Sequence, residues 1–444
     1  MALPELRRVL GPATGVAVCC GMAVGAGILR TPGAIAAQLP DPAWIFGVWL
    51  LGALVATLDA FILAEMAAML PRVGGLVAYV RLSFGRGPAF LVGWSMLLIT
   101  WPASLAGVAV VTGELLAGGA STLVGEGSTT AGRSYAVALI AAVAGVNLLG
   151  LRAGARFEVV STGLKVLLLA GVCVAAALAA PVAEVVAPPP FPATTNALLA
   201  AIGGAMTAVI FSYDGYADAV YLAGETRDPG KALPRALFTA LVTITGLYLL
   251  ANATFLWVLG TGGLAASQFA ALDVAARAFG EVGSTVLTVV AVVVLVGAVN
   301  GYFLTGPRIG RLLAEEGLAL AAFGRVGASG VPVVGTVWIA VAGIGFASTN
   351  TFAQLLEFTV PIIAATTALV AIGLLVQRAR APERPRPFRV RWAWAVVGLQ
   401  VAIGMTLLYS FLCANPWALA IDAGALAVGL CAYLVVRKRA APAP

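Results

Sequence analysis

The chain has 444 residues, of which 61% are hydrophobic and only 10% are charged, and its mean hydropathy is +1.01. This composition excludes a soluble globular protein and predicts an integral membrane protein. The absence of histidine excludes histidine-based catalysis, histidine proton relays and most zinc sites, while the formal charge of +7 has to be explained by where the basic residues lie.

Twelve apolar segments follow one another, each long enough to cross a membrane. Their approximate bounds are 13–38, 43–70, 88–117, 134–150, 157–180, 196–224, 235–260, 281–313, 333–348, 352–378, 391–413 and 415–436. The loops between them are too short to hold a soluble domain. The five cysteines all lie in apolar segments without metal-ligand spacing, so we expect no metal, no cofactor and no disulfide framework.

The first segment contains residues that an ordinary spanning helix avoids. Gly25-Ala26-Gly27-Ile28 is followed closely by Arg30 and Pro32. Glycine costs about 1 kcal/mol and proline about 3 kcal/mol relative to alanine inside a helix. The pattern predicts a helix that opens at mid-membrane and leaves amides free. The alternative is a close helix–helix contact through the GxxxG pair of Gly21 and Gly25.

The basic residues are distributed very unevenly between the two sides of the predicted spans. With the N-terminus in the cytoplasm, 22 of the 26 Lys and Arg residues fall on the cytoplasmic side, Arg133 and Arg277 fall outside, and Arg30 and Lys165 lie within spans. This positive-inside asymmetry predicts cytoplasmic N- and C-termini. The basic loop 378–391 is expected to face anionic lipid rather than nucleic acid.

The sixth segment is interrupted in a similar way. Ser212, Asp214, Gly215 and Asp218 break an otherwise apolar run. Interrupted helices at corresponding positions of two halves are typical of secondary transporters, and a half-helix N-terminus there can hold a carboxylate while free carbonyls hold an ammonium. A zwitterion fits both. Because the chain has no Walker motif, we do not expect ATP-driven pumping.

In these interrupted segments and in several further motifs, the sequence resembles the amino acid–polyamine–organocation (APC) superfamily, and bacterial relatives of the L-type amino acid transporters in particular. The resemblance extends in order over spans one to ten. The matching motifs are Gly25–Gly33 in span one, Ala64–Gly75 at the end of span two, Phe211–Tyr216 and Gly224–Arg235 in and after span six, and Gly297–Arg308 in span eight.

The resemblance implies a twelve-helix membrane protein with a five-plus-five inverted repeat (LeuT-type) and helices 1 and 6 unwound at mid-membrane. The implied organisation is a cytoplasmic tail at 1–12, repeat 1 at 13–180, an extracellular linker at 181–195, repeat 2 at 196–378, a basic cytoplasmic loop at 379–390, two further spans at 391–436 and a tail at 437–444.

The resemblance also implies a substrate site at the two interruptions. The amides of Ala26, Gly27 and Ile28, beside Gly25, would hold the substrate carboxylate. The carbonyls of Phe211, Ser212 and Asp214, beside Gly215, would hold its amino group. The Phe211 ring would be a thin lid on the outer face of the site; the alternative is an ordinary core- or lipid-facing aromatic ring. The Asp214 carboxylate would either favour a cationic group or only cap the half-helix, and Asp218 would cap the second half-helix.

Lys165 lies about a third of the way into span five. A long lysine side chain at such a position can extend to the headgroups. The resemblance implies a different role, because a lysine here stands where sodium-coupled relatives bind an ion. Its ammonium would bond to the span-one backbone near the break, and it would also be able to carry a coupling proton.

Three further polar residues are candidates for a vestibule or gate. Arg30 could face the outer vestibule and pair with Asp59 or with Asp214, and it would either attract anionic substrates or be a structural pair. Asn300 is either an interhelical hydrogen-bond partner or a neighbour of the site. Two architectural expectations accompany them: a closing network of Glu225 with Arg227, Lys231 and Arg235, and a short surface helix over residues 262–280 that could cover a pathway.

These features predict a secondary transporter, not an enzyme, that moves amino acids across the bacterial cytoplasmic membrane by alternating access. The expected mode is sodium-independent exchange, and proton-coupled symport is the alternative. A polyamine or other small-amine transporter, a membrane-embedded enzyme and a transport-fold sensor are more distant. The expected partners are the amino acid and membrane lipid, with no nucleic acid. We expect no covalently linked ancillary subunit, because no cysteine lies in an outside loop, and a monomer.

Overall fold

The computed structural model describes residues 10–70, 74–118, 129–178, 186–327, 330–414 and 416–439, and these form helices joined by short connections. Within these ranges, the pairing between Leu10 and Thr226 is an isolated bridge. The predicted all-helical class is confirmed. The predicted tails at 1–12 and 437–444, the linker at 181–195 and the end of the span-two motif lie partly outside the described residues.

The segment predicted as the first repeat begins with two short helices in place of one long one. Its elements are α1 (Pro12–Ala23), α2 (Ala26–Gln38), α3 (Pro42–Met69), α4 (Gly75–Phe84), α5 (Arg86–Ser95), the π-helical turn η1 (Met96–Thr100), α6 (Trp101–Gly118), α7 (Thr129–Leu148) and α8 (Leu151–Leu178).

The segment predicted as the second repeat also begins with a short helix that is interrupted. The elements from there to the end of the chain are α9 (Thr195–Tyr213), the 3₁₀ helix η3 (Asp218–Glu225), α10 (Pro229–Ala266), α11 (Ala270–Thr305), α12 (Pro307–Glu315), the 3₁₀ helix η4 (Ala321–Gly324), α13 (Val333–Thr349), α14 (Phe352–Arg380), α15 (Ala393–Ala414) and α16 (Pro416–Arg439).

Ten helical segments of the described chain are long and apolar enough to cross a membrane, which confirms a multi-pass membrane protein. Two of the twelve predicted spans, 333–348 and 415–436, correspond to shorter apolar helices, Val333–Thr349 and Ala420–Val435. Gly75–Phe84 is a third short apolar helix. The total of twelve spans therefore stays a prediction.

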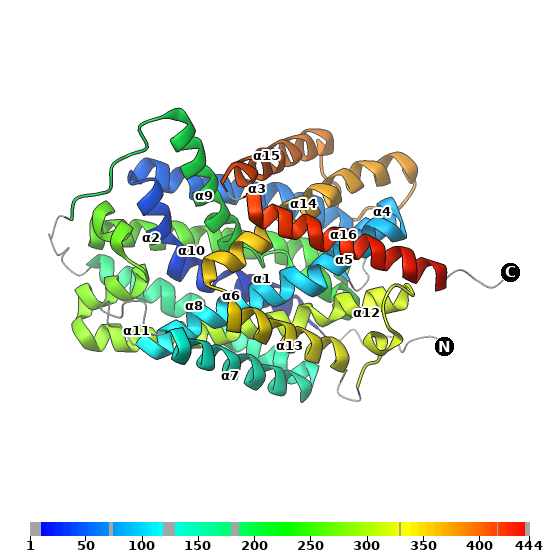
Figure 1. The fold of residues 1–444 in the computed structure, drawn as a ribbon, viewed down its shortest axis with the longest axis horizontal. Helices are drawn as coiled ribbons and strands as arrows, with labels where there is room; N and C mark the ends of the chain where they lie inside the picture. The colour runs from blue at the N-terminus through cyan, green and yellow to red at the C-terminus, as the bar shows by residue number, and fades with distance from the viewer. Residues whose placement is uncertain are drawn as a thin grey trace.

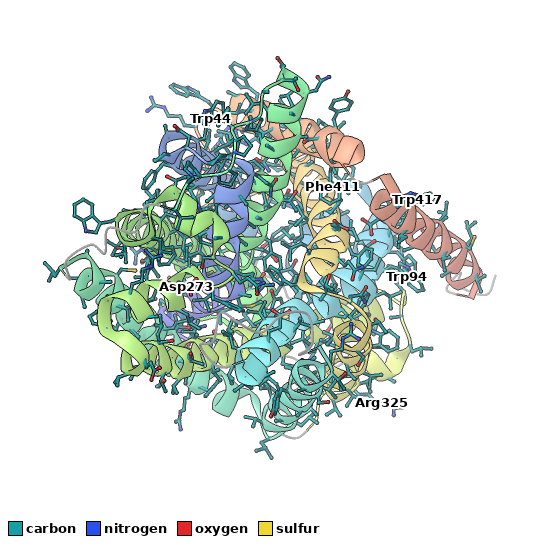
Figure 2. All side chains as sticks on the ribbon, turned by 60° about the vertical axis from the view of Figure 1, so that its left-hand side comes forward. Trp44, Trp94, Asp273, Arg325, Phe411 and Trp417 are labelled. Atoms are coloured by element: carbon teal, nitrogen blue, oxygen red, sulfur yellow. The ribbon has the colours of Figure 1, made fainter. Side chains whose placement is uncertain are left out.

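The helices form one bundle with α1 near its centre, where it packs against α8, α10 and α11. In Figure 1, α7 and α13 lie along the lower edge, α15 lies at the upper edge, and α16 runs across the right-hand half toward the C-terminus. The outer surface is apolar and carries large aromatic side chains. Figure 2 shows Trp44 and Trp417 on this periphery, and their exposed fractions are 38% and 80%. Exposed tryptophan on an apolar helix surface is typical of lipid-facing segments.

The segment at 262–280 differs from the single surface helix expected there. Residues up to Ala266 continue α10 beyond a kink at Gly260, and a new helix, α11, begins at Ala270 and kinks at Gly280. Both kink glycines have a positive φ, of 67° and 66°. The segment lies against the middle of α2, since a β-carbon on Gly33 would fall 2.0 Å from the Ser267 carbonyl oxygen.

Candidate functional site

The first interruption lies between α1 and α2. α1 ends at Ala23, Val24 and Gly25 are not helical, and α2 begins at Ala26. The first amides of a helix have no intrahelical partner, and no side chain caps the α2 N-terminus. The amides of Ala26, Gly27 and Ile28 therefore form a partly positive end inside the bundle, which favours an anion.

The alternative interpretation, a close helix–helix contact through Gly21 and Gly25, also applies to this part of the chain. A β-carbon on Gly21 would lie 1.9 Å from Glu158 Oε1 of α8, and one on Gly25 would lie 3.3 Å from the Ala298 β-carbon of α11. Gly21 therefore permits a close approach of α1 to α8, while Gly25 opens the helix.

The second interruption follows α9, which ends at Tyr213. Asp214 leaves the helix with a ψ of 139°, and Gly215 has a φ of 102°. This φ lies in the left-handed region that glycine adopts readily. A β-carbon on Gly215 would also lie 2.6 Å from the Met22 β-carbon and 2.8 Å from the Ala23 nitrogen. Only glycine meets both conditions, so the chain can turn here against the end of α1.

The two interruptions are in contact with each other. A β-carbon on Gly27 would lie 2.5 Å from Ser212 Cα. The Ser212 hydroxyl lies 2.7 Å from the Ala208 carbonyl oxygen, to which it donates, and 3.0 Å from the Thr31 hydroxyl. The start of α2 is thus seated directly on the end of α9.

A tyrosine that was not among the predicted site residues joins the two interruptions. The Tyr248 hydroxyl of α10 is fully buried and lies 2.6 Å from both the Ala23 and the Ser212 carbonyl oxygens. One hydroxyl proton can serve only one carbonyl at a time. Tyr248 therefore occupies part of the acceptor capacity of Ser212, one of the carbonyls expected to face the substrate amine.

A cavity adjoins the second interruption. Its walls come from α3, α4, η1, α6, the end of α9, the interruption itself, η3, α11 and α14. The polar and aromatic side chains that line it include Asp59, Thr100, Trp101, Ser104, Tyr213, Asp214, Tyr216, Asp218, Tyr221, Tyr302 and Thr367. Two of the predicted site residues, Asp59 and Asp214, meet in this cavity. Gly25, Ala26, Gly27 and Ile28 do not line it, and neither do Phe211, Ser212 or Gly215.

The Phe211 ring lies between two scaffold helices. It packs edge-on against Phe352 of α14 with a centroid distance of 5.4 Å, and its Cζ would be 3.8 Å from a β-carbon on Gly107 of α6. This position just before the interruption is compatible with the expected lid, which stays a prediction.

Lys165 does not extend to the surface. Its side chain is fully buried, and Nζ donates to the Gly21 carbonyl oxygen at 2.6 Å. Glu158, about two helical turns earlier on α8, is also fully buried and accepts from Asn300 Nδ2 at 2.8 Å. Asn147 of α7 then donates to Asn300 Oδ1 at 2.8 Å. Asn300 is thus an interhelical hydrogen-bond partner, outside the cavity lining.

The partners predicted for Arg30 are wrong. Its guanidinium pairs with neither Asp59 nor Asp214, and lies 3.3 Å from Glu114 of α6, 3.3 Å from Gln268 Oε1 and 4.9 Å from the Phe269 ring centroid. Arg30 lies one turn into α2, and the 267–269 connection lies alongside it. The sequence did not indicate that this connection would bring Gln268 and Phe269 to it.

The network predicted around Glu225 is also wrong. Arg227, Lys231 and Arg235 are exposed, and Glu225 forms a bidentate pair with Arg308 of α12, with both bonds at 2.8 Å. Helix η3 turns the Glu225 side chain inward, where it is only 1% exposed.

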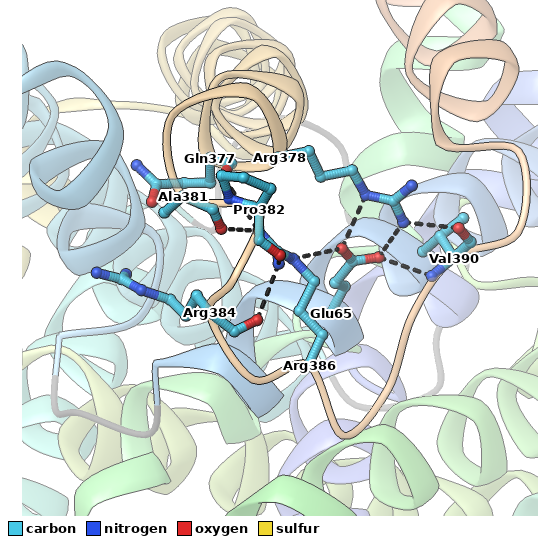
Figure 3. Close-up of polar contacts among 8 residues, drawn as sticks. All are labelled: Glu65, Gln377, Arg378, Ala381, Pro382, Arg384, Arg386 and Val390. Carbon is cyan, nitrogen blue, oxygen red and sulfur yellow. Dashed lines mark hydrogen bonds and ion pairs between the residues drawn. The ribbon is translucent and has the colours of Figure 1, made fainter.

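A second charged cluster holds the end of α3 against the end of α14 and the chain that follows it (Figure 3). Glu65 accepts from Arg378 at 2.9 and 2.5 Å and from the Val390 amide at 2.6 Å, and Arg386 lies 3.5 Å away. Glu65 is fully buried. Part of the basic loop is therefore held against α3 by these contacts and contributes to the folded structure.

These features define the class of protein: a multi-pass helical membrane protein with two helices interrupted side by side, a polar cavity at one interruption and a buried lysine behind the other. The sequence pattern of one family, the amino acid permeases, matches residues 10–433. The chain belongs to the amino acid permease (APC) family, which is a family of transporters and not of enzymes.

Three relatives show how far the similarity extends. The serine/threonine exchanger SteT of Bacillus subtilis is 27% identical over 70% of this chain and 69% of its own length. The b(0,+)-type amino acid transporter 1 of Mus musculus is 24% identical over 91% and 82%. The Asc-type amino acid transporter 1 of Mus musculus is 27% identical over 92% and 77%.

Proposed function

We propose that this protein exchanges amino acids across a bacterial cytoplasmic membrane by alternating access and without sodium, using a five-plus-five repeat whose first helices carry the two interruptions. The family supports an amino acid as the cargo. One of the relatives is named as an exchanger, and this supports the mode of transport.

The observation that carries the proposal is the Lys165 contact. A fully buried ammonium lies 2.6 Å from the Gly21 carbonyl, one turn before the first interruption. A cation that is part of the chain supplies the charge that a sodium ion would supply in sodium-coupled relatives. Since this charge cannot dissociate, it cannot couple transport to a sodium gradient. Exchange against a second amino acid needs no such gradient.

The substrate would be held between the two interruptions. The free amides of α2 favour its carboxylate, and the carbonyls that end α9 favour its ammonium. The direct contact between Gly27 and Ser212 means that α2 and α9 have to separate slightly to admit it. Alternating access would provide this movement.

Proton-coupled symport is the second candidate because Glu158 shares the buried region with Lys165. Its carboxylate accepts from Asn300 and Thr162 and has no contact with water. A buried carboxylate beside an ammonium is a possible proton site in a transporter.

Uptake into proteoliposomes distinguishes the two modes. Labelled amino acids are supplied outside in sodium-free buffer, with or without trapped unlabelled amino acids and with or without an inward proton gradient. The proposal predicts uptake that requires trapped amino acid and ignores the gradient. Uptake into empty vesicles driven by external acid would establish symport, and a requirement for sodium would overturn the interpretation of Lys165.

A further inference from the structure

We propose that the cavity beside the second interruption binds the cationic side chain of the substrate, so that the preferred cargo is a basic amino acid of the lysine type. This inference rests on the proposed function and adds a side-chain subsite to it. The subsite consists of Asp59 of α3, Asp214 of the interruption, Asp218 at the start of η3, and Thr100 of η1.

The first support is a cluster of three carboxyl groups without a basic partner. Asp59 and Asp218 are each only 6% exposed, and Asp214 lines the same cavity. In the part of the chain that the structure describes, no Lys or Arg lies within ion-pair distance of any of the three. Buried carboxylates are costly unless they are paired, so this arrangement favours a ligand that brings positive charge.

The second support is a hydroxyl that has no partner. Thr100 is 2% exposed and lines the cavity, and its Oγ1 is buried without a hydrogen-bond partner among the described residues. Such orphaned hydroxyls are rare in folded proteins and are often satisfied by a ligand or water. Thr100 ends a π-helical turn, and π-helical turns occur frequently at functional sites.

The remaining wall suits an alkyl chain that carries a cation. Trp101 and Tyr221 pack edge to face with their centroids 4.9 Å apart, and both line the cavity together with Tyr302. Aromatic rings attract ammonium and guanidinium groups and also accept methylene contacts. A neutral polar side chain would leave the carboxylates unpaired.

The position of the cavity links this subsite to the backbone site. Asp214 and Asp218 flank Gly215, which rests on Met22 and Ala23 at the end of α1. A substrate with its carboxylate at the α2 amides and its α-ammonium at the α9 carbonyls would therefore reach Asp214 first with its side chain. The main-chain and side-chain subsites share one interruption.

The experiment compares L-lysine with two ligands that each lack one of its charged groups. Exchange of labelled L-lysine by the full chain in proteoliposomes is inhibited with L-lysine, with L-norleucine, which lacks the side-chain ammonium, and with cadaverine, which lacks the carboxylate. A charge-assisted hydrogen bond predicts that lysine inhibits at a concentration about tenfold to a hundredfold lower than norleucine. The ratio of the inhibitory concentration of norleucine to that of lysine is expected to fall at least about tenfold in Asp218→Asn. Asp59→Asn is the second variant if Asp218→Asn does not fold. Glu383→Gln removes an exposed carboxylate of the 381–392 loop and should leave the ratio unchanged.

The outcomes separate this inference from the proposed function. Equal inhibition by lysine and norleucine, unaltered in Asp218→Asn, would overturn the basic-side-chain subsite and leave amino acid exchange intact. Inhibition by cadaverine as strong as by lysine would overturn it in favour of a diamine. If no amino acid is exchanged, the proposed function fails. Calorimetric titration of L-lysine into the detergent-solubilised protein then decides the inference alone: binding lost in Asp218→Asn supports the subsite, and no binding refutes it.

Discussion

The buried pair between Glu225 and Arg308 gives a quantitative prediction about stability. Both side chains are nearly inaccessible, with exposed fractions of 1% and 2%, and two bonds of 2.8 Å join them. With charge centres about 4 Å apart and an effective dielectric constant of about 20, their attraction is about 4 kcal/mol. Removing one partner leaves the other charge buried and unpaired, and such losses are about 3 to 5 kcal/mol.

The substitution Glu225→Gln is therefore expected to lower the free energy of unfolding by about 3 kcal/mol or more. The matched control is Glu316→Gln, since Glu316 accepts from Arg81 at 2.7 Å but the two side chains are 27% and 35% exposed. A pair open to solvent contributes about 1 kcal/mol or less. The same substitution at two bonds of similar length thus separates the effect of burial from that of geometry.

The assay is reversible unfolding in mixed micelles with increasing dodecyl sulfate, followed by the fluorescence of the protein's nine tryptophans. The double variant Glu225→Leu/Arg308→Met, which removes both charges, should be more stable than Glu225→Gln. Equal decreases in the free energy of unfolding for Glu225→Gln and Glu316→Gln would refute the reasoning. A double variant whose decrease equals the sum of the decreases of its two single variants would also refute it.

Three further predictions concern the interruptions and their neighbours. Lys165→Met keeps the length of the side chain but leaves the Gly21 carbonyl without its donor, so the exchange rate in proteoliposomes should fall about tenfold or more; an unchanged rate would contradict the role of the ammonium. Gly27→Ala places a β-carbon 2.5 Å from Ser212 Cα and should cost about 1 to 3 kcal/mol of stability and most transport, whereas Gly47→Ala, with no atom within 4 Å, should be tolerated. Arg30→Gln removes a partly exposed ion pair with Glu114, so the free energy of unfolding should fall by about 1 kcal/mol or less. A larger loss of stability would show that Arg30 holds this part of α2 in place.

Backbone features were predictable from the sequence because they follow from local chemistry. Gly25 and Gly215 stand where helices open, since glycine in an apolar segment lowers the cost of leaving the helix. The helical character of the apolar segments follows for the same reason, because lipid leaves few alternatives. The number of spans does not follow, since the Val333–Thr349 helix, with 17 residues, is shorter than each of the ten segments that are long enough to cross a membrane.

The partners of long polar side chains were not predictable. Arg30 meets Glu114 and Gln268, and Glu225 meets Arg308, across 83 to 238 residues of sequence. Only the packing of distant helices determines such pairs. Asp59 is an instructive case: its spacing from Gly52, Val55, Ala56 and Leu63 on α3 defines one helix face, and that face lines the cavity. Periodicity would have shown the face, but not that Asp214 and Asp218 lie opposite it.

The most direct test of the central claim is efflux of a preloaded labelled amino acid mixture from proteoliposomes in choline buffer. The account predicts little efflux into empty medium and rapid efflux when unlabelled amino acids are added outside, at the same rate with and without sodium. Efflux that is equally fast into empty medium, or that requires sodium, would contradict sodium-independent exchange.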